Sequence, residues 1–208
     1  MTCDIVLAGV GGQGVLSIAA IIAGAAMADG LEVRQSEVHG MAQRGGAVSA
    51  HLRLSDRGIH GDLIPSGGAD LIVSMEPLES LRYLSFLKPA GLIVTAAEPF
   101  VNIPDYPELG PILAAIKTLP RSRVVAAADL ARKAGSARAV NMVIVGAASA
   151  FIPVSPASIE RSIAALFGAK GSSLVEVNLR AFTAGAAAVG ATAAGATAAG
   201  ADGPGAEA

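Results

Sequence analysis

The sequence predicts an α/β fold, with a mostly parallel sheet and helices on both of its faces. Short apolar segments typical of buried strands alternate with longer segments of helical periodicity. The 208 residues are 52% hydrophobic and only 15% charged, with a mean hydropathy of +0.57. So apolar a composition is typical of a sheet covered on both faces, or of a chain with a large partner interface.

A membrane protein is the competing interpretation of this composition. The longest apolar stretches, residues 15–27 and 139–154, are interrupted by glycine, proline and polar residues. Both are shorter than the roughly 20 apolar residues that a spanning helix needs. The N-terminal Met-Thr-Cys-Asp lacks the basic start of a signal peptide. We therefore expect no membrane span and a cytoplasmic location.

Charge and cysteine content argue against further classes of protein. The net charge is -2 with no block of like charge, and aromatic residues make up 3% of the chain, so we expect no nucleic-acid surface. Cys3 is the single cysteine, whereas an iron–sulfur cluster normally needs four thiolates. We expect no internal disulfide, no cluster and no metal site in this chain.

A glycine-rich turn near the N-terminus organises the predicted fold. A strand at residues 4–8 leads into Gly9-Val10-Gly11-Gly12-Gln13-Gly14 and then into an apolar helix at residues 15–27. These are the G-x-G-x-x-G positions of a dinucleotide fingerprint, where backbone N–H groups and the helix dipole favour an anion. Glycine turns also serve close packing alone, so the turn by itself leaves both interpretations open.

A second strand at residues 31–38 completes a βαβ unit, whose two strands we expect to be parallel. Glu37, near the end of this strand, has the position of the acidic residue that holds the ribose in dinucleotide-binding proteins. These features predict a Rossmann-like three-layer sandwich.

A second glycine-rich loop follows directly, with the sequence His39-Gly40-Met41-Ala42-Gln43-Arg44-Gly45-Gly46. An arginine in such a loop offers a bidentate fork for a carboxylate or phosphate, and the glycines allow close backbone approach. The alternative is a structural loop in which Arg44 pairs with a local carboxylate such as Glu37. The loop would also leave the usual adenine pocket poorly walled, which argues against dinucleotide binding.

An added hairpin is expected next. Residues 47–54 alternate between apolar and polar, which predicts a half-exposed strand, and residues 59–64 could return as its partner before Pro65. His51 and His60 lie on or beside these strands without a third ligand at metal spacing, so we expect surface residues.

The alternation of strands and helices resumes near residue 69. Four prolines in residues 99–111 predict an extended segment that wraps a neighbour or covers a site. Asn141 lies in an apolar helix, where an unpaired amide costs about 1 to 3 kcal/mol, so its side chain should hold a loop or face a ligand, the loop being the favoured role. Further strands are expected at residues 70–74, 92–95 and 123–128. A helix should begin at Glu76, present leucines 78, 81, 84 and 87 on one face, and stop at residues 89–91. Later helices are expected at residues 112–119, from an N-cap at Asp129 to residue 134, and at 139–148, 155–167 and 172–185.

The chain should form one domain, residues 1–183, followed by a tail. Residues 184–208 consist mainly of alanine, glycine and threonine. Such a segment has too few large apolar side chains to offset the entropy of ordering, so we expect a disordered tail without chemistry.

The two glycine-rich segments together resemble the gamma-type domain of the 2-oxoacid:ferredoxin oxidoreductase family. The string SEVHGMAQRGG at residues 36–46, with residues 75–79 and 138–141, resembles more narrowly the beta subunit of its indolepyruvate branch. The likeness covers about residues 4–182.

The resemblance implies a complex that oxidatively decarboxylates aryl pyruvates such as indolepyruvate, with coenzyme A as co-substrate, and passes two electrons to ferredoxin. Thiamine diphosphate and iron–sulfur clusters do this chemistry in the family. Residues 61–63 are the nearest approach to the GDG…NN thiamine signature, and they lack its second glycine and its paired asparagines. The resemblance therefore implies that this chain is inactive alone and works with a larger alpha subunit that carries both cofactors.

We hypothesise that residues 11–14 and the loop of residues 43–46 meet the larger subunit beside its thiamine site and help to receive the anionic parts of coenzyme A or the substrate carboxylate, because a helix N-terminus lies beside an arginine loop there. We expect no catalytic residue in this chain alone. Three alternatives stay open: a gamma subunit acting on pyruvate, 2-oxoglutarate or a branched-chain 2-oxoacid, a free-standing dinucleotide-binding protein, and a purely structural subunit. The candidate site residues are Gly9, Gly11, Gly12, Gln13, Gly14, Glu37, His39, Gly40, Gln43, Arg44, Gly45, Gly46 and Asn141.

Overall fold

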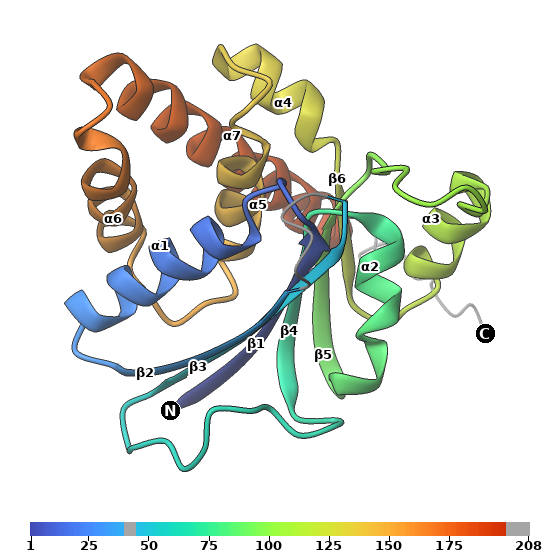
Figure 1. Cartoon of the computed structure of the whole chain (residues 1–208), viewed down its shortest axis with the longest axis horizontal. Helices are drawn as coiled ribbons and strands as arrows, with labels where there is room; N and C mark the ends of the chain where they lie inside the picture. Colours follow the sequence, from blue (N-terminus) through green and yellow to red (C-terminus); the bar gives the residue numbers. More distant parts are fainter. Residues whose placement is uncertain (40–44, 199–208) are drawn as a thin grey trace, which may run out of the picture.

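A six-stranded mixed sheet lies between two layers of helices in the computed structural model, which describes residues 1–39 and 45–198 (Figure 1). The strand order is β2-β3-β1-β4-β5-β6. Strands β1, β4, β5 and β6 are parallel, and β3 is antiparallel to both of its neighbours. The predicted α/β class, a mostly parallel sheet with helices on both faces, is confirmed. The strands are β1 Thr2–Val10, β2 Glu32–His39, β3 Ala47–Ser55, β4 Ala69–Ser74, β5 Leu87–Ala96 and β6 Ser122–Val125.

Helices cover both faces of this sheet. Helices α1 and α5 pack against one face, with α4, α6 and α7 around them, while α2 and α3 lie on the other (Figure 1). No helix in the part of the chain that the structure describes is long and apolar enough to cross a membrane. The helices are α1 Val15–Ala28, α2 Pro77–Arg82, α3 Leu109–Lys117, α4 Ala127–Ala134, α5 Val140–Ser149, α6 Pro156–Gly168 and α7 Ser172–Ala198, with a 3-10 turn η1 at Leu84–Phe86.

The central strand β1 sends side chains into both layers. Ile5 and Leu7 belong to the larger core, which also contains the buried faces of α1 and α5. Val6 points the other way, into a smaller cluster with Ile72 and Ile93. Because a central strand alternates between two buried faces, nearly all of its residues are apolar. This double burial accounts for the composition of the chain.

The hairpin is formed by β2 and β3, so the prediction that residues 59–64 pair with β3 is wrong. Both edges of β3 are already occupied, since Leu52 pairs with Ile5 on one side and with Gln35 on the other. Strands β1 and β2 run in the same direction, as expected, but β3 lies between them. No edge of β3 remains for another strand.

His51 on β3 is buried, with 8% of its surface exposed, so the prediction of a surface residue is wrong for it. Its Nδ1 accepts a 2.9 Å hydrogen bond from the backbone N–H of Ile64, and its ring packs edge-on against Phe86. Burial, followed by the nearby Arg53 charge, holds the pKa of His51 below its ordinary value. The other predicted surface histidine, His60, is exposed.

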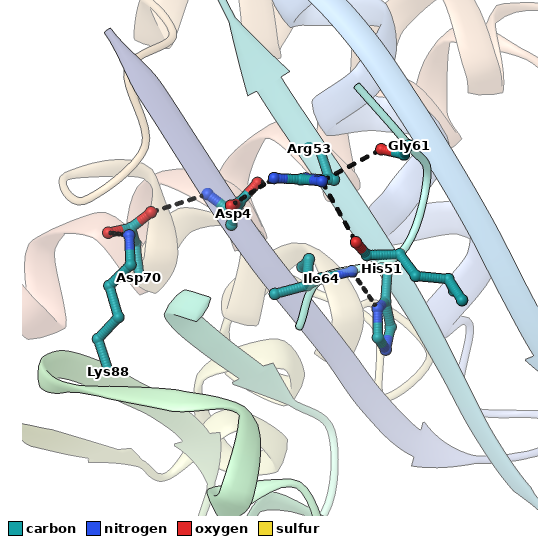
Figure 2. A network of polar contacts seen from close by, with 8 residues as sticks. Asp4, His51, Arg53, Gly61, Ile64, Asp70 and Lys88 are labelled. Atoms are coloured by element: carbon teal, nitrogen blue, oxygen red, sulfur yellow. Dashed lines mark hydrogen bonds and ion pairs between the residues drawn. The ribbon is translucent and has the colours of Figure 1, made fainter. Parts of the chain in front are cut away.

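The loop of residues 56–68 is held against this face by Arg53 (Figure 2). The guanidinium donates two hydrogen bonds to the Asp4 carboxylate, from Nε to Oδ1 at 2.8 Å and from Nη2 to Oδ2 at 3.1 Å. Its Nη1 donates to the carbonyl oxygens of Gly61 and Leu63 at 3.1 and 3.2 Å. The loop therefore covers polar residues of β3 that the alternating pattern predicts to face solvent.

Three local predictions need correction. Helix α2 ends at Arg82, and the expected stop at residues 89–91 lies inside β5, where the fixed φ of proline suits an extended chain. Asp129 is not a helix cap, because α4 begins after Ala126 and Asp129 pairs with Arg132 within the helix. Strand β6 correspondingly ends at Val125.

Helix α7 continues past residue 183, so the expected start of the disordered tail is also corrected. A Cβ at Gly185 would lie 1.9 Å from the carbonyl oxygen of Val143, which shows how closely α7 approaches α5. Val189 is buried as well. Small residues permit this close crossing, which local composition cannot reveal. Residues 199–208 lie outside the described range.

Candidate functional site

The two glycine-rich segments meet at the carboxyl end of β1. The backbone N–H of Gly11 donates to the carbonyl oxygen of Gly46 at 2.8 Å, and the N–H of Gly45 donates to the oxygen of Gly11 at 3.3 Å. The turn that follows β1 and the end of the loop that precedes β3 therefore form one edge, because β1 and β3 are neighbouring strands.

Close packing and backbone conformation account for three glycines of the turn. A Cβ at Gly9 would lie 2.8 Å from Cγ2 of Val15. Gly14 caps α1 with a φ of +84°, and its Cβ would lie 2.8 Å from the amide nitrogen of Asn141. Gly12 also has a positive φ, of +101°, but a Cβ there would face open space. Gly12 is thus the position of the turn that leaves room beside the backbone.

Gln13 stabilises the turn through two side-chain hydrogen bonds. Its Oε1 accepts a 2.7 Å hydrogen bond from the N–H of Val10, and its Nε2 donates to the carbonyl oxygen of Met75 at 3.2 Å. Met75 directly follows β4, so Gln13 ties the carboxyl ends of two parallel strands together. Its side-chain polar groups are engaged within the protein.

A cavity of about 510 Å³ opens beside this turn. Gly12 and Gln13 form one wall, Glu98 after β5 another, and Arg138 and Asn141 at the start of α5 a third. The cavity lies beyond the carboxyl ends of β1, β4 and β5, where open α/β sheets generally bind their ligands.

The charges around the cavity suit an anion. Arg138 is exposed, and its side chain forms no ion pair with the described residues. Helix α5 begins at this cavity without a side-chain cap and without an acidic residue in its first turn, which leaves the positive end of its dipole uncovered. A phosphate or carboxylate at this position would gain from Arg138 and from this helix start.

Glu98 adds a different polar group to the same cavity. Its Oε1 accepts a 3.1 Å hydrogen bond from the backbone N–H of Ala128 in the first turn of α4. Its Oε2 is buried and has no hydrogen-bond partner among the described residues. A buried carboxylate oxygen favours a donor, so a ligand that carries a hydroxyl or amino group near its anionic group would satisfy it.

Asn141 packs beside Gly14 of the turn and lines the cavity, while its Oδ1 accepts from the N–H of Met142 at 3.1 Å. Glu37 lies elsewhere: it is exposed on the edge strand β2, which β3 separates from β1, and its carboxylate accepts from Gln35. A ribose at the glycine turn would therefore be out of reach of Glu37, which removes the support for a dinucleotide site. Three candidates, Gly40, Gln43 and Arg44, and the side chain of His39 lie outside the described residues.

The proline-rich segment at residues 97–108, between β5 and α3, reaches this edge and supplies residues that sequence reasoning missed. Asn102 donates from its amide to the carbonyl oxygen of Gly45 at 2.8 Å. The phenol of Tyr106 donates to the buried carboxylate of Glu76, and burial together with this bond raises the pKa of the phenol. The prolines predicted that the segment covers a site, but its anchors carry no local sequence signal.

Neither a metal nor a cysteine-ligated cluster fits the described residues. They contain no group of three or more histidine, cysteine or acidic side chains placed to hold a metal ion. Cys3 is buried at the start of β1, and burial raises the pKa of its thiol to about 12, so it stays protonated.

The chain is similar to known proteins along most of its length. The model of the pyruvate ferredoxin/flavodoxin oxidoreductase family matches residues 4–188. The chain belongs to this family. Indolepyruvate oxidoreductase subunit IorB of Archaeoglobus fulgidus is 41% identical over 192 residues, 89% of this chain and 94% of the relative. The IorB subunit of Methanothermobacter thermautotrophicus is 39% identical, over 90% of this chain and 98% of that protein. The predicted membership of the 2-oxoacid oxidoreductases, as a subunit of a complex, is confirmed.

Solved structures of this family share the fold. A 2-oxoglutarate:ferredoxin oxidoreductase from Magnetococcus marinus, with 2-oxoglutarate, coenzyme A and succinyl-CoA bound, superposes with a TM-score of 0.73 at 24% identity. The match covers 91% of this chain and 31% of that chain, so the family member contains this fold as about a third of one polypeptide. The gamma subunit of a keto/oxoacid ferredoxin oxidoreductase from Geobacter sulfurreducens has a TM-score of 0.67 at 23% identity, and 99% of it is covered.

Proposed function

We propose that this chain is the small subunit of an indolepyruvate:ferredoxin oxidoreductase. The complex would convert an aryl pyruvate and coenzyme A into aryl-acetyl-CoA and carbon dioxide, and pass two electrons to ferredoxin. The similarity to IorB carries this proposal: four archaeal IorB subunits are 37% to 41% identical, against 30% for a 2-oxoglutarate synthase subunit and 27% for a ketoisovalerate oxidoreductase subunit.

The redox cofactors belong, in this proposal, to a larger alpha subunit. The chain has a single cysteine, which is buried and protonated, and the sequence lacks the thiamine diphosphate signature. Thiamine diphosphate would supply the carbanion chemistry and iron–sulfur clusters the electron transfer, both outside this chain. The assembled complex would work in the cytoplasm, together with its ferredoxin.

The glycine-rich edge would then contribute to binding rather than to bond breaking. Arg138, the uncapped start of α5 and the open backbone at Gly12 suit a phosphate of coenzyme A or the substrate carboxylate. The free oxygen of Glu98 suits a hydroxyl or amino group of the same ligand. We include the Gln43 to Gly46 loop in this edge because Gly45 and Gly46 bond directly to the turn.

Arginine variants of the assembled complex test this role. Arg44→Ala and Arg138→Ala should each raise the Michaelis constant for coenzyme A or for indolepyruvate by about tenfold, which is the loss of roughly 1.4 kcal/mol of binding. Arg57→Ala is the matched control, because Arg57 lies on an exposed turn at the opposite end of the sheet. Normal assembly with both Michaelis constants unchanged in both variants would contradict the binding role.

A further inference from the structure

Residues 97–108, which we call the strap, expose apolar side chains on a backbone that is fixed from both sides. Phe100 is 41% exposed and Val101 is 67% exposed. The N–H of Phe100 lies 3.5 Å from a carboxylate oxygen of Glu76, and the next residue but one, Asn102, bonds to Gly45. The exposed pair is therefore held outward by its neighbours.

The strap borders the candidate site. Glu98 and Pro99, at its start, line the cavity beside the glycine turn. Asn102 connects it to Gly45, which itself bonds to Gly11. A surface formed by Phe100 and Val101 is thus continuous with the edge where we propose that the ligand binds.

Two acidic side chains follow the exposed pair farther along the strap. Asp105 and Glu108 are exposed, and neither forms an ion pair with the residues that the structure describes. The matching surface on a partner would have an apolar centre with basic residues around it.

We propose that the strap is a docking surface for the larger, cofactor-bearing subunit, with Phe100 and Val101 at its centre and Asp105 and Glu108 at its rim. This inference rests on the proposed function. A second copy of this chain is a poorer occupant, because a two-fold contact of strap against strap would bring the acidic rims together. The fold also forms about a third of the Magnetococcus marinus polypeptide, so the relative carries most of its mass outside this fold.

Two substitutions of an exposed aliphatic side chain by asparagine separate docking from a general surface effect. Val101→Asn alters the centre of the strap, while Leu63→Asn alters a similarly exposed side chain, at 63%, on the loop at the opposite end of the sheet. Each full-length variant is co-expressed with the cognate large subunit, and the dissociation constant of the complex is measured by mass photometry on dilution. We expect about a tenfold weaker complex for Val101→Asn and less than about a twofold change for Leu63→Asn. Melting temperatures of the two variants alone should agree with the wild type within about 2 °C.

A charge variant tests the rim independently. Asp105→Lys should weaken the complex by about fivefold at low salt, and the difference from wild type should shrink as salt is raised. An unchanged dissociation constant for Val101→Asn, or a wild-type homodimer that Val101→Asn dissociates, would overturn the docking surface. Those results leave the proposed function standing if the wild-type complex still oxidises 2-oxoacids. Failure of the wild-type chains to associate would contradict both proposals.

Discussion

The side-chain amide of Asn102 donates a 2.8 Å hydrogen bond to the carbonyl oxygen of Gly45, 57 residues earlier in the chain. Through Gly45 and Gly46, this bond connects the strap to the glycine turn, since both glycines bond to Gly11. Three segments that are distant in sequence thus form one continuous edge. Of the three hydrogen bonds, only the one from Asn102 involves a side chain, so it is the one that a substitution can remove.

Asn102→Asp removes the donor and places a carboxylate against the carbonyl oxygen of Gly45. We expect the Michaelis constant for coenzyme A or indolepyruvate to rise by about three- to tenfold in the assembled complex, with a smaller change in kcat. Gln35→Glu is the control, because it makes the same amide-to-carboxylate change on the edge strand β2. Equal effects of the two variants on steady-state kinetics would show that Asn102 does not position the edge.

Tyr106→Phe removes the hydroxyl that donates to Glu76. Because Glu76 is 1% exposed, its Oε1 would keep only the long contact from the N–H of Phe100. The unfolding free energy should fall by about 1 to 3 kcal/mol in urea titrations. Tyr83→Phe removes a hydroxyl for which the described structure shows no hydrogen bond, and should cost less than about 0.5 kcal/mol. If the Tyr106→Phe chain is as stable as the Tyr83→Phe chain, the hydrogen bond from Tyr106 to Glu76 does not stabilise the fold.

Gly14→Ala and Gly12→Ala both place a side chain at a positive φ, which costs about 1 to 2 kcal/mol. Only Gly14→Ala also displaces the Asn141 amide, 2.8 Å from the new Cβ. Gly14→Ala should therefore be the more destabilising change, by about 1 kcal/mol or more in chemical denaturation. Adding Asn141→Ala should reduce that excess, and a strictly additive double variant is the contrary result.

His51 predicts a pH dependence of stability. Its folded pKa lies below the ordinary 6.5 because of burial and the Arg53 charge, so the native state binds fewer protons than the unfolded state. The unfolding free energy should be fully retained above pH 6.5 and fall as pH drops through the folded pKa of His51. His51→Asn keeps a hydrogen-bond acceptor for Ile64 but does not titrate, so denaturation curves of this variant should show a shallower fall. The same slope in both proteins would exclude His51 as its source.

The local part of this fold could be predicted from sequence. The strand, turn and helix of residues 4–27 have an apolar run, glycines and a helical segment in direct succession, so the order of these elements can be read from the local sequence. The positive φ values at Gly12 and Gly14 explain why glycine occupies these positions. The meeting of two glycine-rich segments also followed from their places at strand ends.

The non-local part could not be predicted. The insertion of β3 between β1 and β2 depends on long-range pairing, and an alternating strand has the same pattern whether a loop or solvent covers its polar face. His51 and Arg53 illustrate this, since both bond to the loop of residues 56–68, which covers this face. Likewise Asn102, Tyr106, Glu98 and Glu76 act at the site through partners far along the chain.

Ferredoxin reduction by the reconstituted complex tests whether this chain belongs to an indolepyruvate:ferredoxin oxidoreductase. The chain is co-expressed with its cognate large subunit and assayed with indolepyruvate, coenzyme A and thiamine diphosphate, beside each subunit alone. We expect ferredoxin reduction and aryl-acetyl-CoA formation by the complex, none by this chain alone, and a higher kcat/KM for indolepyruvate than for pyruvate, 2-oxoglutarate or 2-ketoisovalerate. An assembled complex that prefers one of these other 2-oxoacids, or activity of this chain alone, would contradict this function.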